Sequence, residues 1–306
     1  MDVVRSLAPG LSTRPSVLTM GKYDGVHLGH QQLISTTVER ARSLGMQSVV
    51  LTWEPHPNAV IRPDAPLHLL TSLEERIELI AALAPDLLIV APFTAETRAT
   101  SAEDYMRQIV AAIPVRELWV GEDFAMGRGR TGDVATLMAI GVELGFAVGA
   151  VRKVIVGGEP VSASRVREVL RRGAVDEAVA LLGRPFGLRG VVVEGDRRGR
   201  TIGFPTANLR VDPTHVLPAD GVYAGHVYLN GEALPAVTNV GLRPTFNGLH
   251  RTVEAHLLDW SGDLYGRSIR VTFLHRLRGE QRFEGPAALV AQIRQDAARA
   301  RELLQL

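Results

Sequence analysis

The sequence predicts an α/β domain with a mostly parallel sheet, followed by a second domain of antiparallel strands and one terminal helix. The first half alternates apolar runs with segments of helical period, which is typical of a parallel sheet covered by helices. The second half carries β-branched runs separated by turns, with no helical pattern until its end. The 306 residues are also long for one compact core, which favours two domains.

In the first domain, the apolar runs predict strands and the periodic segments between them predict helices. Strands are expected at residues 16–20, 47–52, 87–90, 118–121 and 147–154, and helices at 30–44, 73–83, 102–113 and 133–144. Two shorter helices, 164–172 and 175–182, end at Gly173 and Gly183, where glycine commonly terminates a helix. Pro185 follows, so the first domain is predicted to cover residues 1–184 and the second residues 185–306.

The second domain is predicted to be a small antiparallel β-barrel closed by a C-terminal helix. Its strands are expected at residues 190–193, 222–229, 236–240, 252–257 and 268–274, and its helix at 286–304. The dipeptide Asn230-Gly231 between two of these strands is a strong hairpin signal. A sandwich of two sheets would show the same pattern.

Composition and charge exclude several classes of site. The chain has no cysteine, which rules out disulfides, thiol nucleophiles and thiolate metal sites, and is compatible with a cytoplasmic location. A formal net charge of +1 gives no reason to expect a nucleic-acid or membrane partner. No apolar run approaches the roughly 20 residues that a membrane span needs. We therefore expect small-molecule partners, and a homo-oligomer is compatible with this composition.

A first candidate site follows the first strand, where Met20 to Gln32 are MGKYDGVHLGHQQ. His27 and His30 are three residues apart at the expected start of a helix, so their imidazoles should lie on one side of its first turn. A helix N-terminus is partly positive, which favours an anion such as phosphate between the two rings. Gly25 and Gly29 would let the backbone approach a bulky ligand. The alternative is that the histidines cap a helix and the glycines turn the chain.

A second phosphate-binding candidate begins at Val161, in the string VSASRVREVL. Ser162 or Ser164 is suited to begin a helix, and Arg165 and Arg167 lie within its first turns. Hydroxyl and guanidinium groups suit phosphate oxygens. By itself, the segment is equally typical of a Ser-capped surface helix with solvated arginines.

A third candidate, in the second domain, is the string GDRRGRTIGFPTANL from Gly195 to Leu209. Thr206 and Asn208 alternate along an extended segment, so they should point to one side. Their oxygens suit a hard ion such as Mg²⁺, and the glycines and arginines before them suit an anion. The alternative is a loop that only reverses the chain.

A general base is predicted on a nearby strand, residues 251–258. Thr252, Glu254 and His256 share one face of it. An alcohol becomes a good nucleophile only when a base takes its proton, and Glu254 is the candidate for that role. Taken alone, the pattern more commonly means a polar, solvent-facing side of a strand.

These strings, in this order, resemble the bacterial bifunctional riboflavin kinase/FMN adenylyltransferase family. YDGVHLGH is similar to the FDGVHxGH form of the nucleotidylyltransferase HxGH motif, and SASRVR is similar to SSTxxR, with Ala163 and Ser164 in place of Ser and Thr. GEDFAMGRGRTGD from Gly121 resembles GxDFxFGxxxxGD, with Met126 in place of an aromatic residue. GDRRGRTIGFPTAN resembles GxxRGxxxGxPTAN, and NVGLRPTF and VEAHLLDWSGDLYG also match segments of the kinase.

The resemblance implies a Rossmann-like adenylyltransferase domain and a β-barrel riboflavin kinase domain. It implies that riboflavin and ATP give FMN and ADP, and that FMN and ATP give FAD and pyrophosphate, both with Mg²⁺. The catalytic residues it implies are His27, His30, Ser164, Arg167 and Glu254, and the metal ligands are Thr206 and Asn208. The implied nucleotide- and flavin-binding residues are Gly21, Asp24, Gly29, Asp123, Ser162, Gly195, Arg200, Gly203, Asn239 and Arg243.

Three other functions account for part of the pattern. A riboflavin kinase with a degenerate first domain would not need His27, His30, Ser162 and Arg167 together. An aminoacyl-tRNA synthetase shares the HxGH motif, but the chain has no KMSKS-like string and its PTAN half would be unexplained. A flavin-storage protein would have no use for the Mg²⁺ and base residues of the second domain.

Overall fold

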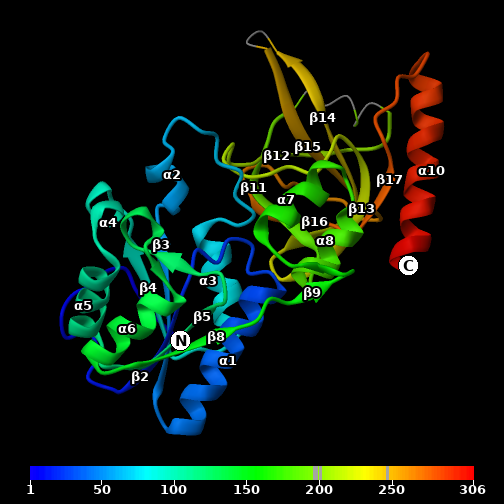
Figure 1. The fold of residues 1–306 in the computed structure, drawn as a ribbon. Coiled ribbons are helices and arrows are strands. Elements are labelled where there is room, and N and C mark those ends of the chain that lie inside the picture. The colour runs from blue at the N-terminus through cyan, green and yellow to red at the C-terminus, as the bar shows by residue number, and fades with distance from the viewer. Residues whose placement is uncertain (196–198, 200–201, 246–247) are drawn as a thin grey trace. The chain divides into compact units, whose positions relative to one another are not determined.

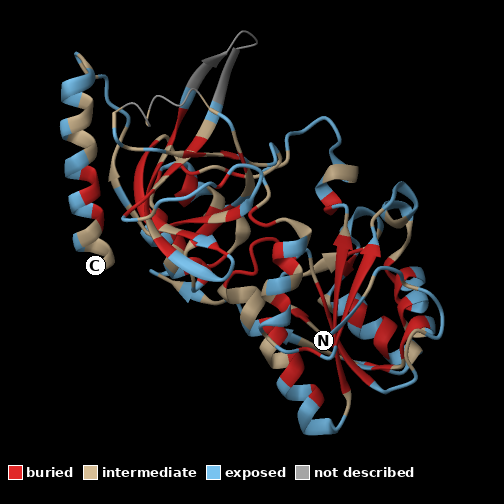
Figure 2. Cartoon of the chain, turned by 180° about the vertical axis from the view of Figure 1, so that it is seen from behind, coloured by how far each residue is buried: buried red, intermediate tan, exposed pale blue. Residues whose placement is uncertain are grey.

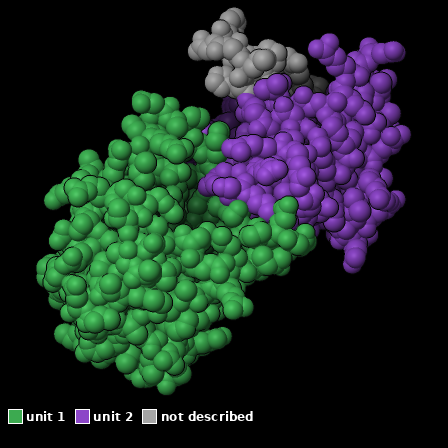
Figure 3. Space-filling view, in the orientation of Figure 1, with its two compact units in different colours: residues 1–163 green, residues 164–306 purple. Residues whose placement is uncertain are grey.

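The computed structural model describes residues 1–195, 199, 202–245 and 248–306, with the side chains of 243–250 outside the description. The chain forms two compact units, Met1–Ala163 and Ser164–Leu306, which are coloured separately in Figure 3. This division lies upstream of the boundary predicted at 184/185, because the two short helices fall with the second unit. Among the described residues, no helix is both long and apolar enough to cross a membrane.

The first unit is built on a six-stranded sheet in which every neighbouring pair is parallel, as predicted. The strand order is β1-β4-β3-β2-β5-β8. The strands are β1 (Asp2–Val4), β2 (Ser16–Met20), β3 (Gln47–Glu54), β4 (Leu87–Pro92), β5 (Val115–Gly121) and β8 (Ala147–Val151). The chain adds β3 and β4 on one side of β2 and then β5 on the other. Ligands of such sheets bind beyond the carboxyl ends of the strands at this kind of switch point.

Helices cover both faces of this sheet and form a separate core on each (Figure 1). They are α1 (Leu28–Leu44), α2 (Pro57–Ile61), α3 (Leu73–Ala81), α4 (Ala95–Ala99), α5 (Ala102–Ala112) and α6 (Val134–Leu144). Strand β3 shows why two cores arise: Val49 and Leu51 pack with α5 and α6, whereas Val50 packs with α1 and α3. The central strands are accordingly buried on both sides (Figure 2).

A 3-10 turn and two short strand pairs complete the first unit. A 3-10 turn, Arg128–Arg130, sits between the short paired strands β6 (Ala125–Met126) and β7 (Gly132–Asp133). A second short pair, β9 (Ile155–Val156) and β10 (Glu159–Pro160), precedes α7 (Ala163–Arg171).

The second unit contains a closed antiparallel barrel, which confirms the predicted barrel. The sheet order is β14-β15-β12-β11-β16-β13-β17, and a further pairing of β14 with β13 closes it. The strands are β11 (Phe186–Val193), β12 (Ala207–Arg210), β13 (Gly221–Leu229), β14 (Glu232–Thr245), β15 (Gly248–Leu257), β16 (Ser268–Phe273) and β17 (His275–Arg278). Asn230 and Gly231 both have positive φ, 51° and 87°, as the predicted hairpin turn requires.

Helices α7, α8 (Val175–Leu182) and α10 (Pro286–Leu304) complete the second unit. On the outer face of the barrel, Val222 and Val237 pack against Ala297 and Ala300 of α10. The guanidinium of Arg278, at the end of β17, pairs with the carboxylate of Asp296 on α10, with Nη2 and Oδ2 2.9 Å apart. The terminal helix is thereby fixed to one side of the barrel.

Candidate active sites

The HLGH segment of the first unit connects the end of β2 to the start of α1. His27 is the N-cap residue of α1 in extended conformation, and its Nδ1 accepts the backbone N–H of His30 at 3.4 Å. The two imidazoles stack, with ring centroids 3.6 Å apart and planes 19° apart. The two imidazoles thus lie on one side of the first helical turn, as predicted, next to the N-terminus of α1.

The environment of His30 favours its neutral form. Burial lowers the pKa of His30 well below its usual value, and the nearby charge of His27 lowers it further. The Nδ1 atom of His30 is buried and has no hydrogen-bond partner within the described part of the chain. The edge of the Tyr23 ring packs against His30 with centroids 5.2 Å apart, while the Tyr23 hydroxyl hydrogen-bonds Thr19. His30 therefore carries little positive charge until an anion binds.

The glycines of this loop make room for its own aromatic rings and for a neighbouring leucine. A Cβ on Gly21 would lie 2.9 Å from the ring of Tyr23, and one on Gly29 would lie 3.3 Å from the ring of His27. A Cβ on Gly25 would lie 2.7 Å from a methyl group of Leu70. These contacts are a reason for glycine that is independent of any ligand.

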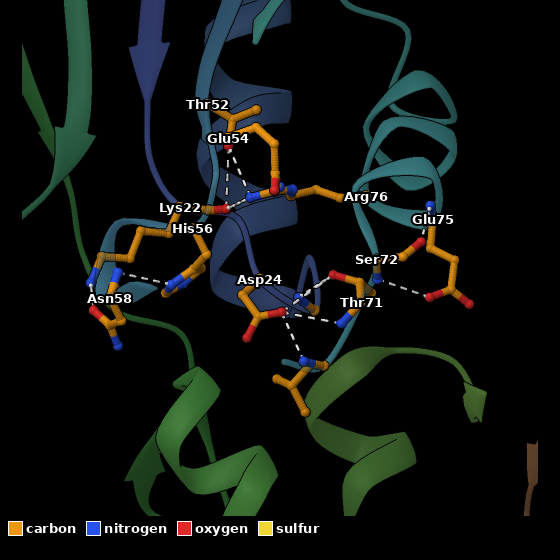
Figure 4. Close-up of polar contacts among 12 residues, drawn as sticks. Lys22, Asp24, Thr52, Glu54, His56, Asn58, Thr71, Ser72, Glu75 and Arg76 are labelled. Atoms are coloured by element: carbon orange, nitrogen blue, oxygen red, sulfur yellow. Dashed lines mark hydrogen bonds and ion pairs between the residues drawn. The ribbon is translucent and has the colours of Figure 1, made fainter. Parts of the chain in front are cut away.

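Asp24 is buried and contacts the segment before α3 (Figure 4). Its Oδ1 atom accepts the backbone N–H groups of Leu70 at 2.9 Å and Thr71 at 3.1 Å. The sequence interpretation of Asp24 as a cofactor-binding residue stays a prediction, and the observed contacts give this carboxylate a role in holding the loop.

The other predicted adenylyltransferase residues occupy different places. Asp123 is exposed and pairs with Lys153, with Oδ2 and Nζ 3.0 Å apart. Ser162 is half-buried and immediately precedes α7, as the helix-start prediction requires. Ser164 is exposed and Arg167 half-buried, both on α7 in the second unit. Neither unit by itself therefore brings Ser164 and Arg167 beside His27 and His30.

In the second unit, the barrel register aligns three predicted kinase residues in one row. Glu254 on β15 pairs with Asn208 on β12 and with Asn239 on β14. Residues directly opposite each other in antiparallel strands share a face of the sheet. That face is the outer one, because Val253 and Ala255, on either side of Glu254, are buried inside the barrel. The row places a carboxylate between two amides.

Two contacts hold the PTAN loop, one at Asn208 of this row and one at His256 on β15. Gly195 lies against the side-chain amide of Asn208, where a Cβ would overlap it. His256 Nδ1 donates a hydrogen bond to the carbonyl oxygen of Pro205 at 2.8 Å. Thr206 is half-buried and two residues before Asn208, on the same side of the extended segment. Gly203 has a φ of 86°, and apart from its two chain neighbours no other described residue has an atom within 4 Å of where its Cβ would be.

Two predicted residues lie outside the described part of this site. They are Arg200 and the side chain of Arg243, although the backbone of Arg243 is paired with that of His250. Within the described residues, no group of three or more His, Cys, Asp or Glu side chains could hold a metal ion. Thr206 and Asn208 do not belong to these four residue types, and their ligand atoms would be hydroxyl and amide oxygens.

Glu280, which belongs to no motif in the sequence, also lies on the outer face of the barrel. Its Oε1 atom accepts the backbone N–H of Leu242 at 3.3 Å, beyond the point where β14 loses its pairing with β13. A Cβ on Gly241 would overlap this oxygen and lie 3.2 Å from the amide nitrogen of Asn239. Only the tertiary structure reveals this second carboxylate beside the row.

Comparisons with known proteins identify the family of each part of the chain. The FAD synthetase family model matches residues 11–165, and the riboflavin kinase family model matches residues 182–304. The bifunctional riboflavin kinase/FMN adenylyltransferase of Escherichia coli K12 is 39% identical, over all of this chain and 99% of that protein. The Bacillus subtilis protein of the same name is 35% identical over 93% of this chain and 91% of its own.

A solved structure has the same fold over nearly the whole chain. It is a crystal structure from Streptococcus pneumoniae, described as a macrolide-efflux protein, with a TM-score of 0.90, 29% identity and 98% of both chains covered. The sequence relatives, matched end to end, and the two family models decide the classification. The chain belongs to the bifunctional riboflavin kinase/FMN adenylyltransferase family.

Proposed function

We propose that the second unit phosphorylates riboflavin to FMN and that the first unit transfers an adenylyl group from ATP to FMN, giving FAD and pyrophosphate. Both family models and the end-to-end relatives support two activities in one chain. The observation that carries the proposal is the stacked pair of His27 and His30 at the start of α1. A kinase with a degenerate first unit would have no use for two imidazoles held at a helix N-terminus.

In the adenylyl transfer, an oxygen of the FMN phosphate attacks the α-phosphorus of ATP, and the bond from that phosphorus to the pyrophosphate oxygen breaks. His27 and His30 would donate hydrogen bonds to phosphate oxygens as negative charge develops on them. The buried Nδ1 of His30, which has no partner in the described residues, fits this role because an incoming proton or phosphate oxygen would satisfy it. Ser162, near the end of the first unit, would contact the rest of the triphosphate. The catalytic roles of Ser164 and Arg167 stay predictions from the sequence.

In the kinase reaction, the primary hydroxyl of the ribityl chain attacks the γ-phosphorus of ATP and ADP leaves. Glu254 would accept the hydroxyl proton, because its carboxylate sits on the outer face of the barrel between Asn208 and Asn239. The two amides would orient the carboxylate and the substrate oxygens. Gly195, Gly203, Arg200 and Arg243 would line the nucleotide and flavin pockets.

The donor set of the second site fits Mg²⁺. Thr206 and Asn208 supply hydroxyl and amide oxygens on one side of an extended segment, and Mg²⁺ usually takes few protein ligands and completes its shell with water and phosphate. When bound, Mg²⁺ would neutralise part of the charge on the transferring phosphoryl group. We also propose a cytoplasmic location and small-molecule partners, without nucleic acid or membrane, and size-exclusion chromatography would test for a homo-oligomer.

The test is a time course. Purified protein is incubated with riboflavin, ATP and Mg²⁺, and riboflavin, FMN and FAD are separated by chromatography. We expect FMN to rise and then give way to FAD, and we expect His30→Ala to stop at FMN. Accumulation of FMN without FAD in the unsubstituted protein would identify a kinase with an inactive first unit. Formation of neither product would contradict both activities.

A further inference from the structure

The loop that carries His27 has a backbone that most side chains avoid. Tyr23, Gly25 and Val26 have φ values of 50°, 77° and 36°. Positive φ is unfavourable for residues with a Cβ, and especially for a β-branched residue such as valine. Such conformations persist only where surrounding contacts impose them, and they are often found at functional sites.

One set of contacts comes from Leu70 and Thr71. Asp24 Oδ1 accepts the backbone N–H groups of both residues, and the backbone N–H of Gly25 donates to the Thr71 hydroxyl at 3.0 Å. The Leu70 side chain packs against Gly25 so closely that a Cβ there would lie 2.7 Å away. The middle of the loop is thus held by both polar and apolar contacts.

A second set comes from Arg76, a residue of α3 that is only 3% exposed. Its Nη1 donates to the carbonyl oxygen of Lys22 at 2.8 Å, just before the positive-φ residues. Its Nη2 pairs with Glu54 Oε2 at 2.6 Å, at the end of β3 (Figure 4). The guanidinium therefore links the start of the loop to the carboxyl end of a neighbouring strand.

Both sets come from residues 70–76, and a capping box makes this stretch rigid. The Ser72 hydroxyl accepts the backbone N–H of Glu75 at 3.1 Å, and the Glu75 carboxylate accepts the backbone N–H of Ser72 at 3.0 Å. Thr71 and Arg76 are thereby held on either side of the first turn of α3. The sequence predicts a helix at residues 73–83, but it does not predict these contacts.

We propose that Thr71 and Arg76 are positioning residues for adenylyl transfer. They hold the loop of residues 22–26 in its unfavourable backbone conformation, which sets the stacked geometry of His27 and His30. They act through the loop and do not touch the reacting phosphates. This inference rests on the proposed adenylyltransferase activity of the first unit.

The test compares conservative substitutions. Thr71→Val keeps the shape but removes the acceptor for Gly25, whereas Thr71→Ser keeps a hydroxyl. Arg76→Lys keeps the charge but cannot bridge Lys22 and Glu54 as a planar guanidinium does. Arg107→Lys makes the same change on the exposed side of α5, where Arg107 pairs with Glu103. FMN and ATP are supplied directly, and kcat and KM are measured for FAD formation.

We expect Thr71→Val and Arg76→Lys to lower kcat by about tenfold to a hundredfold, because small misplacements of catalytic groups have effects of this size. The KM values for ATP and FMN should change little, and Thr71→Ser and Arg107→Lys should stay close to the unsubstituted protein. The imidazole ¹H–¹⁵N signals of His27 and His30 should shift in Thr71→Val and remain in place in Arg107→Lys.

Two results would overturn the proposal. One is an unchanged kcat in both Thr71→Val and Arg76→Lys. The other is a lost rate that is fully explained by a smaller folded fraction, measured by circular dichroism, while the histidine signals of the folded protein stay in place. Absence of FAD formation by the unsubstituted protein is a separate outcome, because it contradicts the proposed activity instead.

Discussion

His27 and His30 stack with their ring centroids 3.6 Å apart, at the N-terminus of α1. Two protonated imidazoles at this distance would repel each other, and the partly positive helix end would add to that repulsion. Burial and the neighbouring His27 accordingly lower the pKa of His30 well below its usual value. His30 is therefore predominantly uncharged at neutral pH until an anion arrives.

The first prediction is that ATP binding to the first unit takes up a proton. The polyphosphate favours the protonated form of His30 and so raises its lowered pKa. Binding should therefore consume up to about one proton near neutral pH, and affinity should increase as pH falls from about 8 to 6. Titration calorimetry in two buffers with different ionisation enthalpies measures this uptake. His30→Asn controls for protons bound by ATP itself, and an identical uptake in both proteins would contradict the prediction.

The second prediction separates two roles of Asp24. If its main role is to accept the N–H groups of Leu70 and Thr71, Asp24→Asn keeps a carbonyl oxygen for them, whereas Asp24→Ala leaves buried donors unpaired. We expect Asp24→Ala to destabilise the first unit by about 1–3 kcal/mol more than Asp24→Asn, and to lose more adenylyltransferase activity. Thermal unfolding and FAD formation from FMN measure the two effects. Equal and complete inactivation of both variants would indicate that the negative charge itself acts on the ligands.

Local motifs allowed the sequence to predict the HLGH and PTAN segments, but not what holds them. Period-two alternation placed Glu254 on the polar face of its strand, yet the pairing with Asn208 and Asn239 depends on barrel register. Arg76 has the sequence context of a solvated helix residue, and its burial arises only when α3 packs beside the ends of β2 and β3. Glu280 meets Gly241 only because β14 extends beyond β13. Contacts between distant segments are the part that local patterns do not encode.

The third prediction concerns Glu254 as the base of the kinase. Glu254→Gln keeps the size of the side chain and its place between two amides but removes its ability to accept a proton. We expect riboflavin phosphorylation to fall by about 10²–10⁴-fold, while FAD formation from supplied FMN is unchanged. The matched control is Glu232→Gln at the exposed start of β14. Retention of kinase activity in Glu254→Gln would assign the proton to another acceptor.

The fourth prediction concerns the metal ligands. Asn208→Ala removes one of the two oxygen ligands proposed for Mg²⁺ and should raise the Mg²⁺ concentration needed for half-maximal kinase activity by at least about tenfold. The Mg²⁺ dependence of FAD formation in the same protein is the internal control and should not move. If kinase activity falls without any change in its Mg²⁺ dependence, Asn208 acts on the substrate or on Glu254 and not on the metal.

The last prediction concerns the ion pair that fixes α10 to the barrel. The side chains of Arg278 and Asp296 are only 15% and 6% exposed, and Arg278 Nε also donates to Asp296 Oδ2 at 2.9 Å. Asp296→Ala would leave a buried guanidinium without its carboxylate, so we expect the second unit to lose about 3–5 kcal/mol of stability. Replacing both partners, as in Arg278→Met with Asp296→Leu, removes both charges and should restore much of that loss.

An exposed pair on the same helix supplies the control for this experiment. Arg299 and Glu302 are both more than half exposed, so Arg299→Ala should change stability by less than about 1 kcal/mol. Kinase activity remaining after equilibration in urea reports unfolding of the second unit separately from the first. If Asp296→Ala were as stable as Arg299→Ala, apolar packing of Ala297 and Ala300 would be sufficient to hold α10, and the ion pair would serve another purpose.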